Sequence, residues 1–277
     1  MTTFSGWPTV AVLEGAEANA WAELQEALPL ELRTALKARV VRNGIVSILM
    51  TPGADVLAVN RVIGLGCEQP LSGRRLDALI ASYRDAGVQR FVVQFAEDPV
   101  ASDHLSLFQK RGFRIGTPTL RLCRRTSSGM VDPLLDAGLR VVEVKEEQAD
   151  VYQSTIAPVL GVPPEVAVGI RSTMGHRNWK YYLVFDGDRP IAGGAMHVHG
   201  DVAWCGLTAT IASDRLRGAQ KTLINRRNMD ARSLGCEWIM ADTMPDSESN
   251  PNWSYRNLLE MGFEKLYERT HFIVNCW

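Results

Sequence analysis

Hydrophobic and polar residues in the first half of the chain follow patterns that predict helices and strands in alternation. Hydrophobic residues spaced for one face of a helix run over 74–86 and stop at Gly87. A short hydrophobic run at 91–94 predicts a strand, and a second helical pattern over 105–110 is followed by Gly112. Glycine is favoured just after a helix because it adopts the left-handed backbone conformation at little cost. These two glycines therefore mark helix ends.

The second half of the chain repeats this order of elements. A helical pattern over 221–234 stops at Gly235, a strand is predicted at 238–241, and a further helix over 253–261 stops at Gly262. Two helix-ending glycines with a strand between them, in matching order, favour an internal duplication over a chance likeness of two α/β segments. We therefore predict an α/β (α+β) protein of two lobes, each a mixed, mostly antiparallel sheet flanked by helices.

The remaining patterns complete the two lobes. In the first half we expect a helix at 16–28 and strands at 40–50 and 57–63. In the second half we expect strands at 139–144, 179–185, 190–199, 203–211 and 270–274, with helices at 146–160 and 164–172. Polar and turn-forming residues at 125–133 predict a linker. The expected domains are 1–125 and 139–277, joined by a linker at 126–138.

Composition and charge narrow the classes of function. Of 277 residues, 46% are hydrophobic and 22% are charged, which suits a protein with a buried core. Thirty basic and thirty-one acidic residues give a net charge of −1, so a general affinity for nucleic acid is not expected. The five cysteines are scattered, and neither a secretion signal nor an apolar run of about 20 residues is present. We expect a cytoplasmic protein without a membrane partner.

The segment at 208–224 combines a strand, a polar turn and the start of a helix. Arg215, Arg217, Gly218 and Lys221 stand at this junction. The first turn of a helix leaves backbone N–H groups unpaired and carries partial positive charge, so it attracts anions. Gly218 lets an anion approach the backbone because it has no Cβ. The combination predicts a diphosphate site, and the alternative is an ordinary strand–helix turn with solvated arginines.

The six residues at 215–220 resemble a motif of the GNAT (GCN5-related N-acetyltransferase) family. That motif, Arg/Gln-x-x-Gly-x-Gly/Ala, binds the pyrophosphate of acetyl-CoA, and Gln220 departs from its last position. The resemblance implies that the preceding strand pairs with the pantetheine arm and polarises the thioester carbonyl where it splays. The cofactor residues implied here are Thr208, Ala209, Thr210, Arg215, Leu216, Arg217, Gly218, Ala219, Gln220 and Lys221.

A second segment, 250–263, resembles the Ser-x-Arg-Asn-x-x-x-x-Gly-Phe variant found in GNAT proteins. In the commoner family pattern a Tyr four residues before the Gly protonates the leaving thiolate, and Leu258 stands at that position. Tyr255, three residues earlier and on nearly the same helix face, is the substitute catalytic residue that we expect. Its alternative role is to pack the helix onto the sheet. The resemblance also implies cofactor contacts at Asn250, Ser254 and Asn257.

Other candidate residues are weaker. The first lobe lacks the phosphate motif and carries only Arg74 and Arg75 after Gly73, so it resembles a degenerate copy. His197 and His199 share one strand face, where one of them could act as a base. No third ligand completes a metal site with them, and we expect no metal.

The resemblance implies an acyl-CoA-dependent N-acyltransferase, in its simplest form one that transfers an acetyl group from acetyl-CoA to a primary amine within a ternary complex. The acceptor would be a small molecule or a peptide. Two alternatives stay open. The chain could bind CoA without catalysis, which Leu258 favours, or it could be a tandem GNAT that uses another acyl donor. Neither the acceptor nor the oligomeric state can be read from the sequence.

Overall fold

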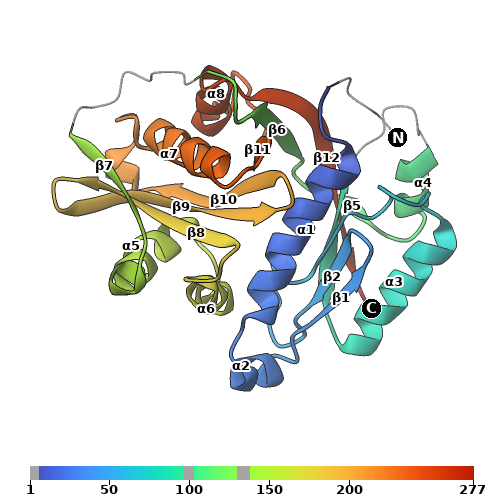
Figure 1. The fold of residues 1–277 in the computed structure, drawn as a ribbon. Helices are drawn as coiled ribbons and strands as arrows, with labels where there is room; N and C mark the ends of the chain where they lie inside the picture. Colours follow the sequence, from blue (N-terminus) through green and yellow to red (C-terminus); the bar gives the residue numbers. More distant parts are fainter. Residues whose placement is uncertain (1–5, 97–102, 130–137) are drawn as a thin grey trace. The chain divides into compact units, whose positions relative to one another are not determined.

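The fold is described from a computed structural model that covers residues 6–96, 103–129 and 138–277. These residues form two compact units (Figure 1). The first unit contains the chain up to Thr119 together with Tyr267–Trp277, and the second contains Leu120–Leu266. The expected domain limits of 1–125 and 139–277 stay a prediction. The last strand of the chain is thus grouped with the N-terminal unit.

The first unit is a mixed sheet with helices on both faces. Its sheet order is β1-β2-β3-β4-β12, with β5 also paired to β12. Only the β3–β4 pair is parallel among the pairs described in this unit. Its elements are α1 (Val10–Glu26), α2 (Leu30–Ala35), β1 (Arg39–Asn43), β2 (Val46–Met50), β3 (Arg61–Ile63), α3 (Gly73–Ala86), β4 (Arg90–Ala96), α4 (Asp103–Gln109), β5 (Arg114–Ile115) and most of β12 (Glu264–Asn275).

The second unit has the same architecture. Its sheet order is β6-β11-β10-β9-β8-β7, and only β10 and β11 run parallel among the pairs described in this unit. α5 packs on β9 and β10 from one face, and α7 packs on the same strands from the other (Figure 1). The elements are β6 (Thr119–Arg125), β7 (Leu139–Glu143), η1 (Glu146–Gln148), α5 (Ala149–Leu160), α6 (Pro164–Thr173), β8 (Trp179–Asp186), β9 (Arg189–His199), β10 (Val202–Thr210), η2 (Ala212–Asp214), α7 (Ala219–Ser233), β11 (Trp238–Thr243) and α8 (Trp253–Glu260).

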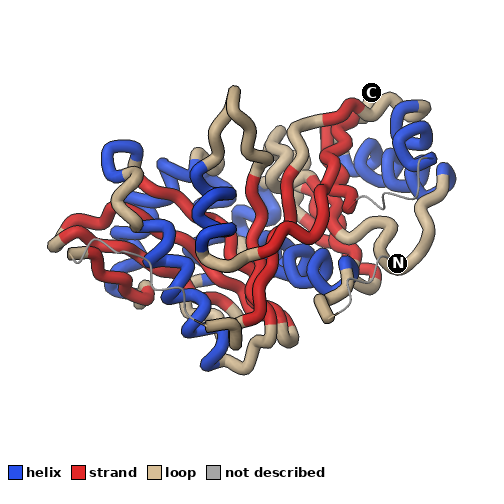
Figure 2. The backbone as a smooth tube through the Cα atoms, turned by 90° about the horizontal axis from the view of Figure 1, so that it is seen from above, coloured by secondary structure: helices blue, strands red, loops and turns tan. Residues whose placement is uncertain are grey.

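The predicted repeat is confirmed at the level of topology. In each unit a helix connects the two parallel strands, as α3 connects β3 to β4 and α7 connects β10 to β11. Figure 2 shows the helices lying beside the strands in a view from above. The glycines expected to end the four helices all have left-handed backbone angles, with φ values of 83° at Gly87, 79° at Gly112, 82° at Gly235 and 78° at Gly262. Because this conformation strains other residues, these glycines fix where each helix stops.

Each unit takes one strand from the other half of the sequence. β6 belongs to the first half and pairs with β11, and its Leu120 and Leu122 enter the core of the second unit. β12 lies at the C-terminal end and pairs with β4, and its Phe272 stacks on Phe108 with ring centroids 3.8 Å apart. The two halves of the chain have therefore exchanged their final strands.

Polar contacts reinforce the exchanged strand of the first unit. Glu14 and Glu17 of α1 are buried, and Tyr267 of β12 donates a hydrogen bond of 2.8 Å to Glu14. Arg269 of β12 is also buried and pairs with Glu17. A buried charge is tolerated when a partner of opposite charge lies beside it, so these contacts tie β12 to α1.

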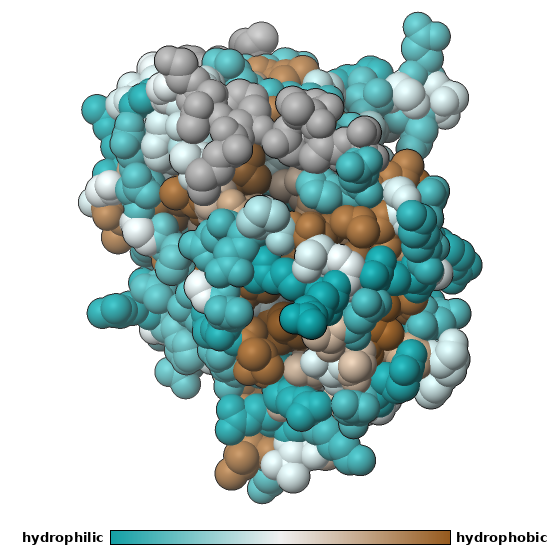
Figure 3. All heavy atoms as spheres, turned by 90° about the vertical axis from the view of Figure 1, so that its right-hand side faces the viewer, coloured by the Kyte–Doolittle hydropathy of each residue, from teal (hydrophilic) through white to brown (hydrophobic). Residues whose placement is uncertain are grey.

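The surface of the first unit follows from the amphipathic pattern of its helices. Leu76, Leu79 and Tyr83 of α3 are buried in the aromatic core, and the ring of Tyr83 stacks on Phe91 at 3.8 Å. The face of the molecule that carries α3 is largely hydrophilic with scattered hydrophobic patches (Figure 3). None of the helices in the described segments combines the length and apolar character needed to cross a membrane.

Three expectations from the sequence are corrected. The single strand expected at 40–50 is a hairpin of β1 and β2, because Gly44 turns the chain with a φ of 58°. The strand expected at 57–63 is formed only over Arg61–Ile63, and the strand expected at 270–274 extends over Glu264–Asn275. β6 was not expected at all. The predicted linker begins where β6 ends, but residues 130–137 lie outside the described segments.

Candidate functional site

The start of α7 presents open backbone N–H groups. Gly218 is its N-cap, with a φ of 83°, and no side chain caps the helix. The first helical bond runs from the Thr222 N–H to the Gly218 carbonyl, so the preceding N–H groups point out of the helix. No protein atom lies within 4 Å of the position that a Cβ on Gly218 would take. The helix start therefore has the room and the polarity to bind an anion.

The strand that leads to α7 is distorted. The register between β10 and β9 shifts between Gly206 and Ala209, and Leu207 has a φ of 50° in this bulge. On its other side β10 pairs with β11 only as far as Cys205, although both strands continue. Beyond Cys205 no further β10–β11 pair is found among the described residues, at the place where the resemblance implies a splay. A bulge of this kind marks functional sites because it aims backbone groups away from the ladder.

Two glycines and one arginine hold the bulge in place. A Cβ on Gly193 would lie 2.8 Å from Ile156 of α5, so only glycine lets that helix approach the sheet. A Cβ on Gly194 would lie 2.9 Å from the Thr208 hydroxyl on the opposite face. Arg227 of α7 is buried and donates hydrogen bonds of 3.0 Å to Thr208 Oγ1 and 3.1 Å to the Ala195 carbonyl. The helix that begins after Gly218 thus also fixes the bulge.

These features border one pocket of about 980 Å³ in the second unit. Its size lies at the upper end of the range for ligand sites. All the cofactor residues predicted from the sequence line it: Thr208, Ala209, Thr210, Arg215, Leu216, Arg217, Gly218, Ala219, Gln220, Lys221, Asn250, Ser254 and Asn257. The structure therefore brings them together at one place. Whether they bind a cofactor stays a prediction.

A network of ion pairs fixes the turn before α7. Asp214 is buried and accepts a hydrogen bond of 2.8 Å from Arg189, and this contact lowers the pKa of Asp214 to about 2. Arg217 pairs with Asp186 at 2.7 Å and approaches Asp214 at 3.6 Å. Hydrogen bonding from Arg217 likewise lowers the pKa of Asp186. Both carboxylates are therefore charged at neutral pH, and Arg217 is held by ion pairs with them.

The other basic residues of the motif differ in how they are held. Lys221 pairs with Glu260 of α8. Arg215 is exposed, lines the pocket and makes no ion pair with any residue that the structure describes. Of the three basic side chains at the helix start, Arg215 is thus the one whose charge is available to a ligand.

Gln220 links α7 to α8 through two hydrogen bonds. Its Nε2 donates to Ser254 Oγ at 2.7 Å, and its Oε1 accepts from Asn257 Nδ2 at 2.8 Å. Asn252 caps α8 by accepting from the backbone N–H of Ser254 at 3.0 Å and of Tyr255 at 3.3 Å. The residue that departs from the family motif therefore connects the two helices on the pocket wall.

Solved structures with a similar arrangement include GNAT proteins. The GCN5-related N-acetyltransferases from Kribbella flavida and Sphaerobacter thermophilus both align with a TM-score of 0.62. The first is 14% identical and covers 94% of this chain and 95% of its own, and the second is 13% identical and covers 96% and 94%. A tandem GNAT protein from the clavulanic acid biosynthesis pathway is 14% identical, with a TM-score of 0.59 over 95% of both chains.

The chain has the GNAT fold. At these identities the likeness concerns the fold alone, and neither a family model nor a curated protein matches the sequence. The alignments run over nearly the whole of each chain, so the likeness includes both units. The predicted fold class is thereby confirmed.

The structure places Tyr255, the expected proton donor, away from the pocket. Tyr255 packs against the hydrophobic core and is not among the pocket-lining residues. Leu258, at the position of the family Tyr, is buried in the same core. The role assigned to Tyr255 stays a prediction without geometric support.

The two histidines also lie apart from the pocket. His197 is fully buried, with its ring 4.8 Å from that of Trp179, and His199 is exposed at the end of β9.

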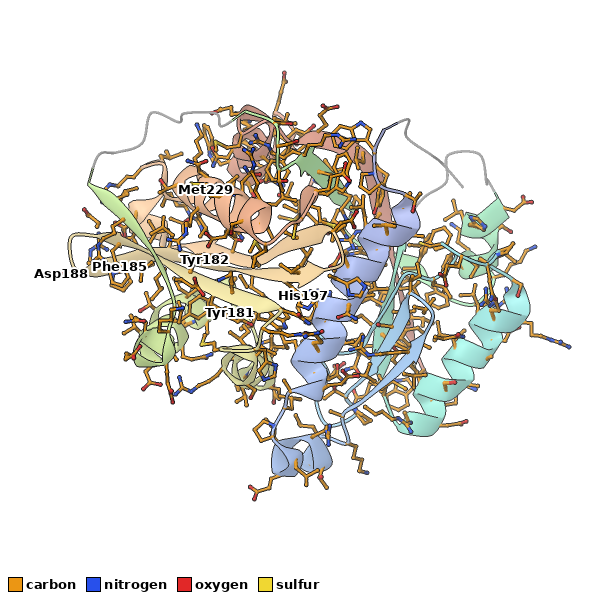
Figure 4. All side chains as sticks on the ribbon, in the orientation of Figure 1. Tyr181, Tyr182, Phe185, Asp188, His197 and Met229 are labelled. Atoms are coloured by element: carbon orange, nitrogen blue, oxygen red, sulfur yellow. The ribbon has the colours of Figure 1, made fainter. Side chains whose placement is uncertain are left out.

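Adjacent residues of the sheet point to opposite faces, as Tyr181 and Tyr182 do (Figure 4). Tyr181 bonds to Thr173 of α6 and Tyr182 to Asp230 of α7. Within the described residues no three His, Cys, Asp or Glu side chains are grouped to hold a metal ion.

The sequence pattern did not indicate the residues that support the pocket from outside its lining. Asp186 and Arg189 come from the β8–β9 turn, and Arg227 lies in the third turn of α7. Only the Gly193-Gly194 pair gave a signal, since two glycines within a strand mark a bulge or a close approach. The others resemble ordinary surface charges in the sequence.

Proposed function

We propose that the chain is an acyl-CoA-dependent N-acyltransferase whose site is the pocket at the start of α7. One observation carries the proposal. A helix N-terminus without a side-chain cap faces the same pocket as a bulged strand that has no paired neighbour along part of one edge. The first suits a diphosphate, and the second suits an extended arm that ends in a polarised carbonyl. The structural neighbours named N-acetyltransferases support the same reading.

The residues of the pocket fit the parts of acyl-CoA. The N–H groups at Ala219–Lys221 and the Arg215 guanidinium would hold the diphosphate. The free edge of β10 at Thr208–Thr210 would pair with the pantetheine amides. Acyl-CoA, when bound, supplies the acyl group as a thioester. The bulge at Leu207 would direct backbone N–H groups to the carbonyl oxygen, where negative charge develops.

The chain would act mainly by binding and orientation. Fixing the thioester and a neutral primary amine in one site removes much of the entropic barrier to their reaction. We further propose a small-molecule or peptide amine as acceptor, acetyl-CoA as the simplest donor and the cytoplasm as location. The degenerate first lobe, which lacks the phosphate motif, would take no cofactor.

The test is thiol release with a panel of primary amines. Purified protein is incubated with acetyl-CoA and each amine, and free CoA thiol is followed over time, while calorimetry measures CoA binding separately. Amine-dependent release together with binding supports the proposal. A protein that binds no CoA would exclude it.

Leu258 favours a second candidate, a CoA-binding protein without catalysis. A buried leucine at the family Tyr position cannot donate a proton to the leaving sulfur. In that case calorimetry would show CoA binding, and no amine or acyl donor would release thiol. A third outcome, release only with a longer acyl-CoA, would identify a tandem GNAT that uses another donor.

A further inference from the structure

We infer that the first unit carries a second ligand site, a pocket that binds a small aromatic phosphate such as a nucleoside monophosphate. The pocket has a volume of about 550 Å³, which is within the range of ligand sites. Its lining comes from α3, the turn after α4, β5 and the end of β12. These residues all belong to the first unit, and none of them lines the pocket at the start of α7.

The pocket lies along α3, where the end of β12 runs past the helix (Figure 1). Ile80 and Ala81 of α3 and Val274 of β12 form its apolar part. The N-terminus of α3, which corresponds to the start of α7 in the repeat, is capped by the Ser72 side chain and does not line the pocket. The pocket is therefore not a remnant of the site that the repeat would place in this unit.

Three arginines line the pocket, and two of them keep hydrogen-bond donors for a ligand. Arg111 donates two hydrogen bonds to Asp77, at 2.7 and 3.1 Å, so its charge is neutralised within the protein. Arg84 donates from Nε to the Cys276 carbonyl at 2.8 Å, and its two terminal nitrogens bond to no residue that the structure describes. Arg114 makes no ion pair in the described part of the chain. Two guanidinium groups thus remain, which suits the charge and the geometry of a phosphate group.

The backbone that carries these groups is held in place. Arg114 lies on β5, which pairs with β12. The Cys276 carbonyl accepts from Arg84, and the Cys276 N–H donates to the Gln89 carbonyl at 2.8 Å. Both bonds fix the chain immediately before Trp277. Groups that are already ordered bind a ligand at a lower entropic cost than mobile ones.

Trp277 supplies an aromatic surface to the pocket. It is 81% exposed, which leaves its indole ring accessible to a ligand. Aromatic rings stack on one another and on guanidinium planes, so an indole beside arginines suits a flat ring that bears negative charge. An aromatic phosphate would use both features of the pocket. Inorganic phosphate would use only the arginines, and an uncharged ring would use only the indole.

A fluorescence titration tests the assignment. AMP is added to the full chain, as wild type and as Gly218→Asp, and tryptophan emission is followed. We expect AMP to quench the emission equally in both proteins, because the site is not the pocket at the start of α7. Trp277→Phe should lose most of the quenching. Adenosine and inorganic phosphate should each bind at least about tenfold more weakly than AMP, because each makes only part of the contacts.

Arginine substitutions identify the groups that bind the phosphate. In Arg84→Gln and in Arg114→Gln we expect the affinity for AMP to fall at least about tenfold, since a hydrogen bond to a charged group changes an equilibrium by that much. Arg74→Gln is the matched control, because it removes an exposed arginine of the same helix that does not line the pocket. The affinity for CoA should be the same in all three variants as in wild type.

Four results would each overturn the inference. They are no quenching of wild type by AMP, an equal loss of affinity in Arg74→Gln, inorganic phosphate that binds as tightly as AMP, and quenching that is lost in Gly218→Asp but kept in Arg114→Gln. The last result would place AMP in the pocket at the start of α7. A chain that binds AMP as expected but no CoA would overturn the proposed function and leave this inference intact.

Discussion

At the scale of single residues, backbone strain is concentrated around the pocket. Three residues other than glycine have positive φ within the described segments: Lys37, Leu207 and Leu216. Leu207 lies in the bulge of β10, and Leu216 lies in the turn before Gly218 and is 77% exposed. Non-glycine residues in this region are strained by about 1 kcal/mol or more, and such strain persists where function requires the geometry.

Gly218 is the residue on which the proposed anion site depends most directly. Gly218→Asp should abolish CoA binding, because it places a carboxylate beside the open N–H groups and strains a backbone with a φ of 83°. Gly218→Ala adds the strain without the charge and should weaken binding less, with a loss of unfolding free energy of about 1 kcal/mol. Calorimetry with CoA measures the difference. Equal affinities in the two variants would show that charge at this helix start is unimportant.

The Arg215 side chain should contribute to the affinity for CoA and not to the stability of the fold. Because it makes no ion pair in the described protein, Arg215→Gln removes only its attraction for the ligand. We expect CoA affinity to fall about tenfold at low salt, with less difference at high salt, and an unchanged unfolding midpoint. Arg232→Gln, at the other end of α7, is the matched control. A similar loss of affinity in the control would point to a general effect of net charge.

His271 should make stability depend on pH. Burial and the charges of Arg269 and Arg61 lower its pKa from 6.5 to about 4. Between these values the unfolded chain binds a proton that the folded chain does not, so stability is full above about pH 6.5 and falls as pH drops towards 4. The loss for this group is on the order of 2–3 kcal/mol.

The His271 effect can be isolated by substitution. His271→Gln retains a polar group near Gln94 and Thr119 but cannot titrate. Urea unfolding at several pH values between 7 and 4.5 should therefore give a shallower decline for the variant than for wild type. Parallel declines would mean that other groups cause the acid sensitivity.

At the scale of elements, glycines and hydrophobic periodicity predicted most of the fold. The four helix-ending glycines were found from the sequence because each closes a regular pattern. β6 was missed because Arg121 and Arg124 are buried, whereas charged residues in a strand suggest a surface. Arg124 is accommodated by the Met261 carbonyl and by the Ser128 and Gly129 carbonyls, none of which a local pattern reveals.

The residues of the candidate site likewise divide into those that the sequence predicted and those that it did not. Most of its lining lies within two short segments, 208–221 and 250–260, and both carry recognisable motifs. Its supports come from elsewhere in the sequence, such as Asp186 and Arg189, whose pairing with the turn before α7 is decided only by the fold. Gln220 looked like a departure from the motif, and the structure gives it two specific partners.

The packing of α5 on β9 depends on Gly193. In Gly193→Ala the new Cβ would lie 2.8 Å from Ile156 and from the Tyr182 carbonyl, so α5 must move away from the strand opposite the bulge. We expect a loss of about 1–3 kcal/mol in the free energy of unfolding, measured by urea denaturation. Gly129→Ala, where no atom lies within 4 Å of the new Cβ, should leave stability unchanged or slightly raised. Equal effects of the two substitutions would contradict the packing argument.

At the scale of the whole molecule, the strand exchange makes each unit depend on both halves of the sequence. The core of the first unit includes Phe272 and Val274 from the C-terminal end, and that of the second includes Leu120 and Leu122. A half-chain ending near 129 would lack the strand that pairs with β4, and a half-chain starting near 138 would lack the one that pairs with β11. An unpaired sheet edge and an opened core would make either half unstable alone.

Cutting the chain between the halves tests this dependence. Residues 130–137 are replaced by a protease recognition site, the folded protein is cleaved, and its size is followed by gel filtration. We expect the two fragments to elute together, because each holds a strand within the other's sheet through the β4–β12 and β6–β11 ladders. In denaturant they should separate. As a control, Phe272→Ala removes the ring stacked on Phe108, at a loss of about 3–5 kcal/mol in the free energy of unfolding. The fragments of this variant should therefore separate at a lower urea concentration. Elution of two half-sized species in native buffer would show that the strands are not exchanged and that each half folds with its own last strand.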